Sequence, residues 1–351
     1  MILTHIFIDG LSGMAFGLFA TLIVGTIICQ IASLIGKNFV GDTLSAIGSV
    51  AKVLMGAGIG IGVAVKFKKS TLLVVSCAVA GMVGAYASKI LSGGMFEGSV
   101  TTLVGVGEPL GAFISAYVAM SVGALVDGKT KIDILITPLV AILSGSVLGL
   151  LVGKPVLIMM TAIGDAINWG TVQQPFIMGI VVSALMGIAL TLPISSAAIG
   201  ISLGLTGLSA GAATVGCCTH MIGFAVMSFR ENRWGGLIAQ GIGTSMLQIG
   251  NLVKKPILWL PPIITSIILG GISTAVLGMT SNAVGSGMGT AGLVGVIMTV
   301  STMTASGVNI WITLLEVAMM YFILPALMCL GISELMRKKG LIKFGDLKIS
   351  L

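Results

Sequence analysis

A single acid interrupts one of the most apolar parts of this sequence. Glu108 lies in the stretch "LVGVGEPLGAFISAY" (residues 103–117), after glycines and directly before a proline. Proline disfavours helical backbone at the residue before it and is well tolerated at the first position of a helix. The pattern therefore predicts an unwound segment, a break at Glu108 and a helix beginning at Pro109. A carboxylate there could accept hydrogen bonds from a solute or take up a proton, or it could only cap the helix.

A histidine lies near the centre of another apolar run, residues 211–229. His220 stands in "GCCTHMIGF", and an imidazole at that depth needs a hydrogen-bond partner. It could donate to a solute or relay a proton. The alternative is a bond to a carbonyl of a neighbouring helix, with Thr219 taking part.

Four carboxamides form a third set of candidate binding residues. Asn168, Gln173 and Gln174 precede the apolar run that begins near residue 175, and Asn282 belongs to the loop sequence "SNAVGSGMGT". Amides both donate and accept hydrogen bonds, as recognition of a sugar requires. Capping of helices and bonding within loops is the alternative role for all four.

Composition identifies the class of protein that must hold these residues. The 351 residues are 56% hydrophobic and 8% charged, whereas soluble domains carry about 25% charged residues. Apolar stretches of about 20 residues, enough to cross a bilayer, recur along the chain. They are residues 14–35, 70–88, 132–152, 174–193, 211–229, 257–279 and 309–332. We expect an all-α, polytopic transmembrane helical bundle.

The net charge of +7 comes from basic residues at the ends of apolar runs. That distribution is typical of cytoplasmic loops facing anionic lipid, and does not indicate a nucleic-acid partner. The most basic block is residues 334–351, which we expect to be a cytoplasmic tail. Arg230, Glu231 and Arg233 are expected to form a solvated loop on the same side.

Three segments differ from plain spanning helices because they are short or interrupted by glycine: residues 53–65, 234–251 and 281–295. Basic residues flank 234–251 on both sides, which favours a re-entrant hairpin. Irregular backbone at membrane depth must be satisfied by protein or by a water-filled cavity. The alternative is that the glycines only allow close packing of helices.

The sequence also contains a weak internal similarity. Residues 136–153 resemble 260–278, and residues 13–26 resemble 177–191. Such pairs are typical of transporters built from two repeats around a central solute site, and they also arise by chance in glycine-rich apolar sequence. A two-fold internal repeat therefore stays open.

No catalytic triad, P-loop or paired metal-ligand spacing is present, so we expect neither a catalytic nucleophile, nor a cofactor, nor a metal site. The five cysteines lie in apolar runs, where buried thiols are expected. Residues 1–351 are expected to form a single membrane domain, because no polar stretch is long enough to fold separately. Any soluble energy-coupling module would then be a different polypeptide.

Several motifs together resemble the phosphotransferase-system EIIC-like membrane proteins, and more narrowly a branch that includes a regulator of perfringolysin. They are "GEPLGAFISAY", "NWGTVQQPFIMGIVVSALMGIALTLPISS", "AGAATVGCCTHMIGFAVMSFREN" and "NAVGSGMGTAGLVG". The resemblance implies a homodimeric bacterial inner-membrane protein with about ten membrane segments and re-entrant hairpins, which translocates a sugar. It also implies that the phosphate for the sugar comes from a separate EIIB component, while this chain holds the sugar and supplies no nucleophile. It also implies that Glu108 and, less directly, His220 contact the sugar.

Three functions follow as expectations. The first is transport of a small polar solute, a sugar or sugar derivative, in the EIIC manner. The second is a regulatory membrane protein that senses a ligand without net transport. The third is an ion-coupled transporter of organic anions, which the basic loops would attract electrostatically. The chain carries no attached EIIA or EIIB domain, which leaves the coupling of transport to phosphorylation open.

Overall fold

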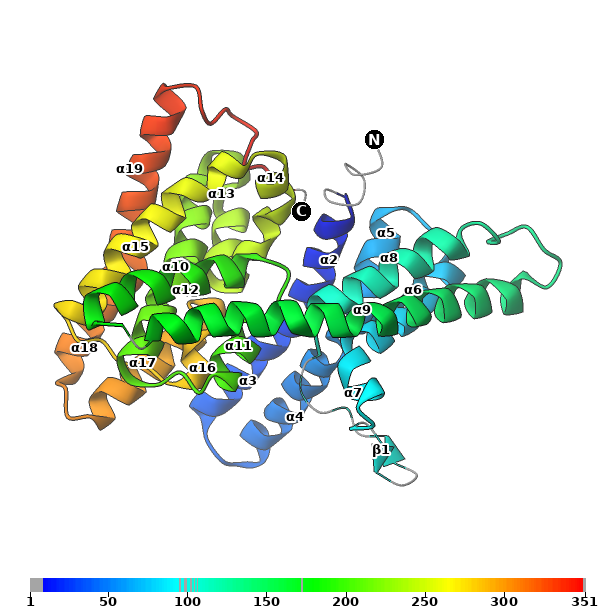
Figure 1. Ribbon diagram of the computed structural model, residues 1–351, viewed down its shortest axis with the longest axis horizontal. Coiled ribbons are helices and arrows are strands. Elements are labelled where there is room, and N and C mark those ends of the chain that lie inside the picture. Colours follow the sequence, from blue (N-terminus) through cyan, green and yellow to red (C-terminus); the bar gives the residue numbers. More distant parts are fainter. Residues whose placement is uncertain are drawn as a thin grey trace. The chain divides into compact units, whose positions relative to one another are not determined.

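The computed structural model describes residues 9–94, 96–97, 100–101, 103, 105, 107–171 and 173–349 (Figure 1). It confirms the all-α prediction, since the strands in this described part are a single pair of two residues each, β1 (Phe96–Glu97) and β2 (Val100–Thr101). The chain divides into two compact units, one ending at Met160 and one beginning at Thr161.

In the first unit, α5 packs against α2 and α6, and α8 packs against both α5 and α6. Its elements are α2 (Leu11–Leu18), the π-helical turn η2 (Phe19–Ile23), α3 (Val24–Ile35), α4 (Phe39–Val53), α5 (Met55–Lys66), α6 (Thr71–Ala85), α7 (Ala87–Leu91), α8 (Pro109–Gly123) and most of α9 (Asp133–Thr171).

The second unit is centred on α12, which packs against α10, α15 and α19. Its elements are α10 (Pro175–Thr191), α11 (Ser196–Ser202), α12 (Gly207–Met227), α13 (Phe229–Ile238), η3 (Ala239–Gly243), η4 (Ser245–Gln248), α14 (Ile249–Lys254), η5 (Pro256–Trp259), α15 (Leu260–Ala275), α16 (Ala283–Ser286), η6 (Ala291–Leu293), α17 (Val294–Ala305), α18 (Ile310–Val317), η7 (Ala318–Ile323) and α19 (Leu324–Lys338). Each of the two sequence similarities pairs one segment of the first unit with one of the second.

Five helical stretches among the described residues are long and apolar enough to cross a membrane. They are Leu11–Ser33, Asp133–Gly153, Gly207–Met227, Pro256–Ala275 and Ile310–Lys338. The pair α4 and α5, bent by 52°, makes a sixth candidate, and four further apolar helices are shorter, at 10–17 residues. The prediction of a polytopic bundle is confirmed, with several of its segments too short to span alone.

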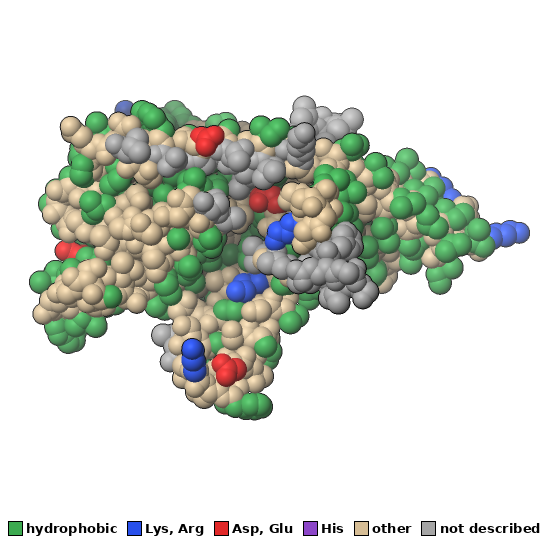
Figure 2. Space-filling view, turned by 60° about the horizontal axis from the view of Figure 1, so that its bottom comes forward, with side chains coloured by type: hydrophobic (Ala, Val, Ile, Leu, Met, Phe, Trp, Pro, Cys, Tyr) green, Lys and Arg blue, Asp and Glu red, His purple; other side chains and the backbone are tan. Residues whose placement is uncertain are grey.

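The surface fits a lipid environment. On the face shown in Figure 2, hydrophobic side chains are much more numerous than charged side chains. Phe39 is 86% exposed, Ile134 80% and Trp311 76%, and each lies on or beside an apolar helix. Large side chains so exposed are unfavourable in water and are normal where hydrocarbon replaces it.

Glycine packing explains how the helices of the first unit approach one another. Gly13 and Gly17 of α2 face Gly58 and Gly62 of α5, and a Cβ at any of the four would meet the backbone or a side chain of the partner helix. Small residues at helix interfaces allow this close contact in membranes. The segment 53–65 is accordingly an unbroken helix from Met55 onwards, so for these glycines the packing alternative is the correct one.

The other two irregular segments have the broken backbone that the sequence predicts. Residues 234–251 run through α13, η3, η4 and α14, and within α13 Arg233 has a φ of 51°. Residues 281–295 contain only α16, η6 and the first turn of α17, with a left-handed Leu293 at φ 60°. Neither segment could cross a bilayer as a regular helix, in agreement with re-entrant chain.

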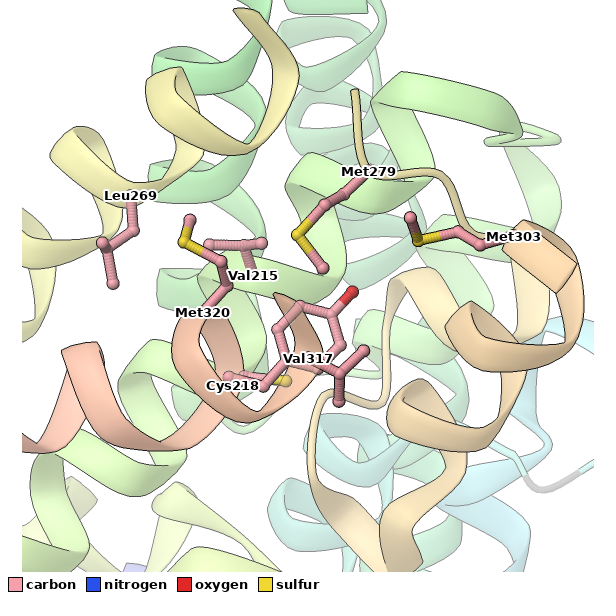
Figure 3. Close-up of a cluster of buried hydrophobic side chains, with 8 residues drawn as sticks. Val215, Cys218, Leu269, Met279, Met303, Val317 and Met320 are labelled. Carbon is pink, nitrogen blue, oxygen red and sulfur yellow. The ribbon is translucent and has the colours of Figure 1, made fainter. Parts of the chain in front are cut away.

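A methionine-rich core fills the second unit (Figure 3). Val215 and Cys218 of α12 lie at its centre and are fully buried. The remaining members come from α15, the loop before α16, α17, α18 and η7, and are Leu269, Met279, Met303, Val317, Met320 and Tyr321. Flexible thioethers fill irregular gaps well, which suits helices of such different lengths and directions. As expected, the cysteines are unpaired thiols, buried except for Cys29.

Helix α9 continues to Thr171, so Asn168 lies inside a helix, which has polar residues such as Asp165 on its exposed side. One prediction about a polar segment was wrong. Glu231 was expected in a solvated loop, but its side chain is fully buried. Its Oε1 accepts a hydrogen bond of 2.9 Å from Nη2 of Arg337, in the last turn of α19, and another from the N–H of Gly345, where the chain after α19 returns to α13. Arg230 is exposed, as expected.

Candidate functional site

The break at Glu108 is confirmed. Helix α8 begins at Pro109, and Glu108 itself has extended backbone with φ −109° and ψ 117°. Gly105 and Gly107 have left-handed φ values of 79° and 75°, which residues with a Cβ adopt at a cost. Residue Val106 between them lies outside the described residues. The glycines therefore unwind the chain, and the proline restarts it as a helix, as the sequence predicts.

The unwound segment is fixed to the break between α6 and α7. The N–H of Glu108 donates to the carbonyl of Ala85 at 2.8 Å, and the hydroxyl of Tyr86 donates to the carbonyl of Gly105 at 2.7 Å. Tyr86 is 1% exposed. A Cβ at Gly107 would contact Ala85, so the close approach requires glycine there as well. Two interrupted helices thus hold one another and position a part-buried carboxylate.

That carboxylate makes no capping hydrogen bond to the first turn of α8. The capping alternative for Glu108 is therefore not what the structure shows. A cation lies close by along the same segment, since Lys89 Nζ would be 3.4 Å from a Cβ at Gly105 and lies 5.6 Å from the centre of the Tyr86 ring. The motif "YASKIL" contains this lysine in an apolar setting, and sequence reasoning overlooked it.

The second candidate, His220, lies at the opposite extreme of burial. It sits two turns before the end of α12 and is fully buried. Its ring centroid lies 6.0 Å from that of Phe224 and 5.9 Å from that of Trp259, so aromatic rings surround one side of it. Trp259, the last residue of η5, therefore packs against the imidazole.

A chain of hydroxyls leads away from this imidazole. Nδ1 of His220 lies 3.1 Å from Oγ1 of Thr191, which lies 2.8 Å from Oγ of Ser245. Thr191 also donates to the carbonyl of Gly187 at 3.1 Å. Because that bond uses the one hydroxyl proton of Thr191, the pattern favours His220 as the donor at Nδ1 and leaves Nε2 as an acceptor. The predicted bond to a carbonyl or to Thr219 is replaced by this one.

Nε2 of His220 has no hydrogen-bond partner among the described residues, although the atom is buried. It lies against Gly187 of α10, where a Cβ would collide with the imidazole. Buried polar atoms without a partner are uncommon and call for an explanation, such as a ligand or a water molecule. The glycine leaves the space that the imidazole occupies, and the imidazole keeps one acceptor available.

The four amides have varied positions. Asn282 caps α16, accepting from the N–H of Gly285 at 3.0 Å, and Gln173 donates to the carbonyl of Trp169 at 3.2 Å. Gln174 precedes α10 and is exposed, without a capping bond to its first turn. The side chain of Asn168 lies outside the described part. Two of the four therefore have the capping or loop roles weighed against solute binding.

The candidate residues divide between the two units: Glu108 belongs to the first, and His220, Gln173, Gln174 and Asn282 belong to the second. Within the second unit, His220 is brought together with Thr191 and Ser245, which sequence reasoning missed. Nothing in their local sequence marks these hydroxyls, because their neighbours lie 29 and 54 residues away along the chain.

Comparison with known proteins adds one result. A family model described as "Phosphotransferase system, EIIC" matches residues 8–349, nearly the whole chain. No curated protein is similar enough to give a match.

Proposed function

Because the chain belongs to the phosphotransferase-system EIIC family, we propose that it moves a sugar or sugar derivative across a bacterial inner membrane. Family and apolar helices together make it a multi-pass membrane protein and a transporter component of the phosphotransferase type. The observation that supports a solute site most directly is the unwound segment at Glu108. Interrupted helices at membrane depth are where transporters hold polar solutes.

In this proposal Glu108 of the first unit and His220 of the second are each a candidate solute contact within their own unit. A carboxylate has about four lone-pair sites and suits several sugar hydroxyls at once. Nε2 of His220 supplies one further acceptor in an otherwise apolar and aromatic setting. Gln174, exposed at the start of α10, is the amide best placed to add a donor without giving up a bond to its own helix.

The proposal assigns energy coupling and assembly to partners. No catalytic nucleophile is assigned to this chain, so phosphate would come from a separate EIIB component bound on the cytoplasmic side. We further propose a homodimer, as the resemblance implies. Cross-linking of the protein in membranes, followed by gel separation, would show whether pairs of chains are neighbours.

The experiment that tests the solute site is thermal unfolding of the purified protein in detergent. Wild type and Glu108→Gln are heated with a panel of sugars, polyols, sugar phosphates and carboxylates. A ligand that binds only the folded protein raises Tm. We expect one sugar class to raise the Tm of wild type and not that of the variant. Equal stabilisation of both proteins, or of neither by any compound, would contradict the role of Glu108.

Uptake into vesicles then separates transport from sensing. Accumulation that requires EIIB and phosphoenolpyruvate supports the proposed function. Binding without accumulation would favour the regulatory alternative, and accumulation driven by a proton or sodium gradient would favour the ion-coupled one.

A further inference from the structure

The chain that follows α19 is part of the folded second unit. Residues 341–349, here called the C-terminal strap, return from α19 to α13 and α14 (Figure 1). Leu347 is 0% exposed and Ile342 2%, and both belong to a hydrophobic cluster with Phe224 of α12 and Leu258 of η5. A basic tail held only by charge would not bury such side chains.

Carboxamides of the re-entrant segment hold the strap by its backbone. Asn232 Nδ2 and Gln248 Nε2 both donate to the carbonyl of Leu347, at 2.8 and 3.0 Å. Asn251 Nδ2 donates to the carbonyl of Lys348 at 3.0 Å, and the N–H of Ile349 donates to Asn232 Oδ1 at 2.9 Å. All four bonds involve main-chain atoms of the strap, which turns at residues 344–347, so they recognise its backbone whatever its side chains.

These amides are connected to one another. Gln248 Nε2 donates to Gln240 Oε1 at 2.9 Å, Asn251 Nδ2 donates to Gln248 Oε1 at 2.7 Å, and Gln240 Nε2 donates to Ser228 Oγ at 2.8 Å. Gln240 and Gln248 are fully buried. Connected buried amides are stabilising only when every member is satisfied, so removing the strap carbonyls leaves donors unpaired.

Ionic contacts add to the backbone bonds. Lys255 Nζ lies 2.6 Å from Asp346 Oδ2, and these side chains are 31% and 24% exposed. The N–H of Gly345 donates to Oε1 of the buried Glu231 at 3.4 Å. The Lys255–Asp346 pair is only part-buried, so ionic strength and pH can change its contribution.

The strap is linked to the buried imidazole through one short turn. Element η4 comprises only residues 245–248, and its last residue, Gln248, bonds the strap. Its first residue, Ser245, bonds Thr191, which bonds His220. A turn of four residues cannot lose its contacts at one end without disturbing those at the other.

We propose that the carboxamides Asn232, Gln248 and Asn251, with Gln240 bonded behind Gln248, form a cradle for a peptide backbone, and that the chain's own C-terminal strap occupies it as a removable latch. While the strap is bound, η4 holds Ser245 against Thr191 and fixes the Nδ1 side of His220. When the strap leaves, η4 loosens and the imidazole changes its hydrogen bonding. The consequence for solute access rests on the proposed function, whereas the latch itself does not.

The test compares Leu347→Asp with Lys348→Asp. The first places a charge in a fully buried position and expels the strap, and the second places the same residue at the exposed next position, where the cradle contacts only the carbonyl. The sequence has two histidines, so in a His5→Gln background ¹⁵N-histidine labelling reports His220 alone. Amide hydrogen exchange of residues 341–349 and 245–252 is measured in the same samples.

We expect Leu347→Asp to raise exchange in both segments at least about tenfold and to shift the His220 signal, while Lys348→Asp changes neither. Faster exchange of the strap with an unchanged His220 signal and unchanged exchange in residues 245–252 would overturn the latch. Equal effects of the two variants would overturn recognition through the backbone.

A milder pair of variants covers the case in which Leu347→Asp does not fold. Lys255→Gln removes the ion pair with Asp346, and Lys254→Gln removes the same charge from the exposed neighbouring residue. We expect about threefold faster exchange of both segments in the first variant only. No difference between the two variants would contradict the proposal. All these readouts are made without solute, so failure of the solute panel leaves the latch standing, and failure of the latch leaves the solute site standing.

Discussion

Two glutamates of this chain differ in burial in the opposite way to what their local sequences predict. Glu108 lies in an apolar stretch and is only part-buried, whereas Glu231 lies between arginines and has no exposed side-chain surface. The first is positioned by backbone within about 20 residues, through Ala85 and Tyr86. The second is buried by Arg337 and by the strap, more than 100 residues later.

The difference shows which kind of burial a sequence can reveal. The hydropathy of the sequence around a residue predicts the surroundings of its own segment, apolar or aqueous. It does not describe a segment that returns from far along the chain and covers a polar loop. Glu231 is therefore expected to act in stability and Glu108 in solute binding, and each prediction below tests that division.

The largest expected effect is on Glu231. Changing Glu231→Gln removes the closer anionic partner of Arg337, whose side chain is 9% exposed, and among the described residues leaves only Glu334, with Oε1 3.8 Å from Arg337 Nε. Breaking a buried pair in this way lowers the free energy of unfolding by about 3 kcal/mol. Thermal unfolding in detergent measures it. The control is Glu334→Gln, whose carboxylate is 31% exposed, pairs with the exposed Arg230 at 3.0 Å and has only a 3.8 Å contact with Arg337; here the loss should stay below about 1 kcal/mol. Equal losses in the two variants would contradict the conclusion that burial makes Glu231 important for stability.

Glu108 should show the reverse pattern. In Glu108→Gln the Tm without solute should stay close to that of wild type, because the backbone bonds at the break involve no carboxylate atom. Affinity for the solute should fall by about tenfold or more, since a charged acceptor is lost. Titration with the sugar found in the panel measures the affinity. Glu316→Gln, the same change in α18, should leave affinity unaltered.

Tyr86 tests whether the break must be held in place for Glu108 to bind. Tyr86→Phe removes the bond to the carbonyl of Gly105 and should lower stability by about 1 kcal/mol. Because the segment then loosens, affinity for the solute should fall as well. Tyr117→Phe provides the control, since the contacts of Tyr117 are with the rings of Phe67 and Phe113, which the change retains. Lower stability with unchanged affinity would mean that the Tyr86–Gly105 bond stabilises the fold but is not needed for Glu108 to bind solute.

The smallest effect concerns pH and the strap that covers Glu231. Partial burial alone raises the pKa of Asp346, but hydrogen bonds from Lys255 and from the N–H of Lys343 outweigh it and hold the pKa below its usual value. A carboxyl whose pKa is lower in the folded state stabilises the fold above its unfolded pKa, about 3.9, and this contribution is lost as pH falls through the folded pKa.

Samples are exposed briefly to a series of pH values and then cleaved with trypsin. Cleavage after Lys343 and Lys348 should be fastest in the samples exposed to the lowest pH. In Asp346→Asn the cleavage rate should be high at every pH and should no longer depend on this titration. A strap equally protected in wild type and variant throughout would mean that the ion pair contributes nothing.

Much of the fold was predictable because its signals are local. The apolar runs, the glycine and proline around Glu108 and the basic residues flanking 234–251 each specify their own backbone, and the structure has the expected helices and breaks there. The extent of α9 was not predictable from its polar residues, because a helix accommodates Asp165 on an exposed side. The partners of His220 could not be predicted, since Thr191 and Ser245 reach it only through the packing of α10 and η4.

The glycine contacts between α2 and α5 have a consequence for how this chain can vary. Gly13 and Gly17 lie one helical turn apart, as do Gly58 and Gly62, and each position faces the partner helix with no room for a side chain. Every substitution there is larger than the residue it replaces. Saturation mutagenesis of the first unit should therefore find that these four positions, spaced by four residues within each helix, accept only glycine. Neighbouring positions on the lipid side should accept almost any apolar residue.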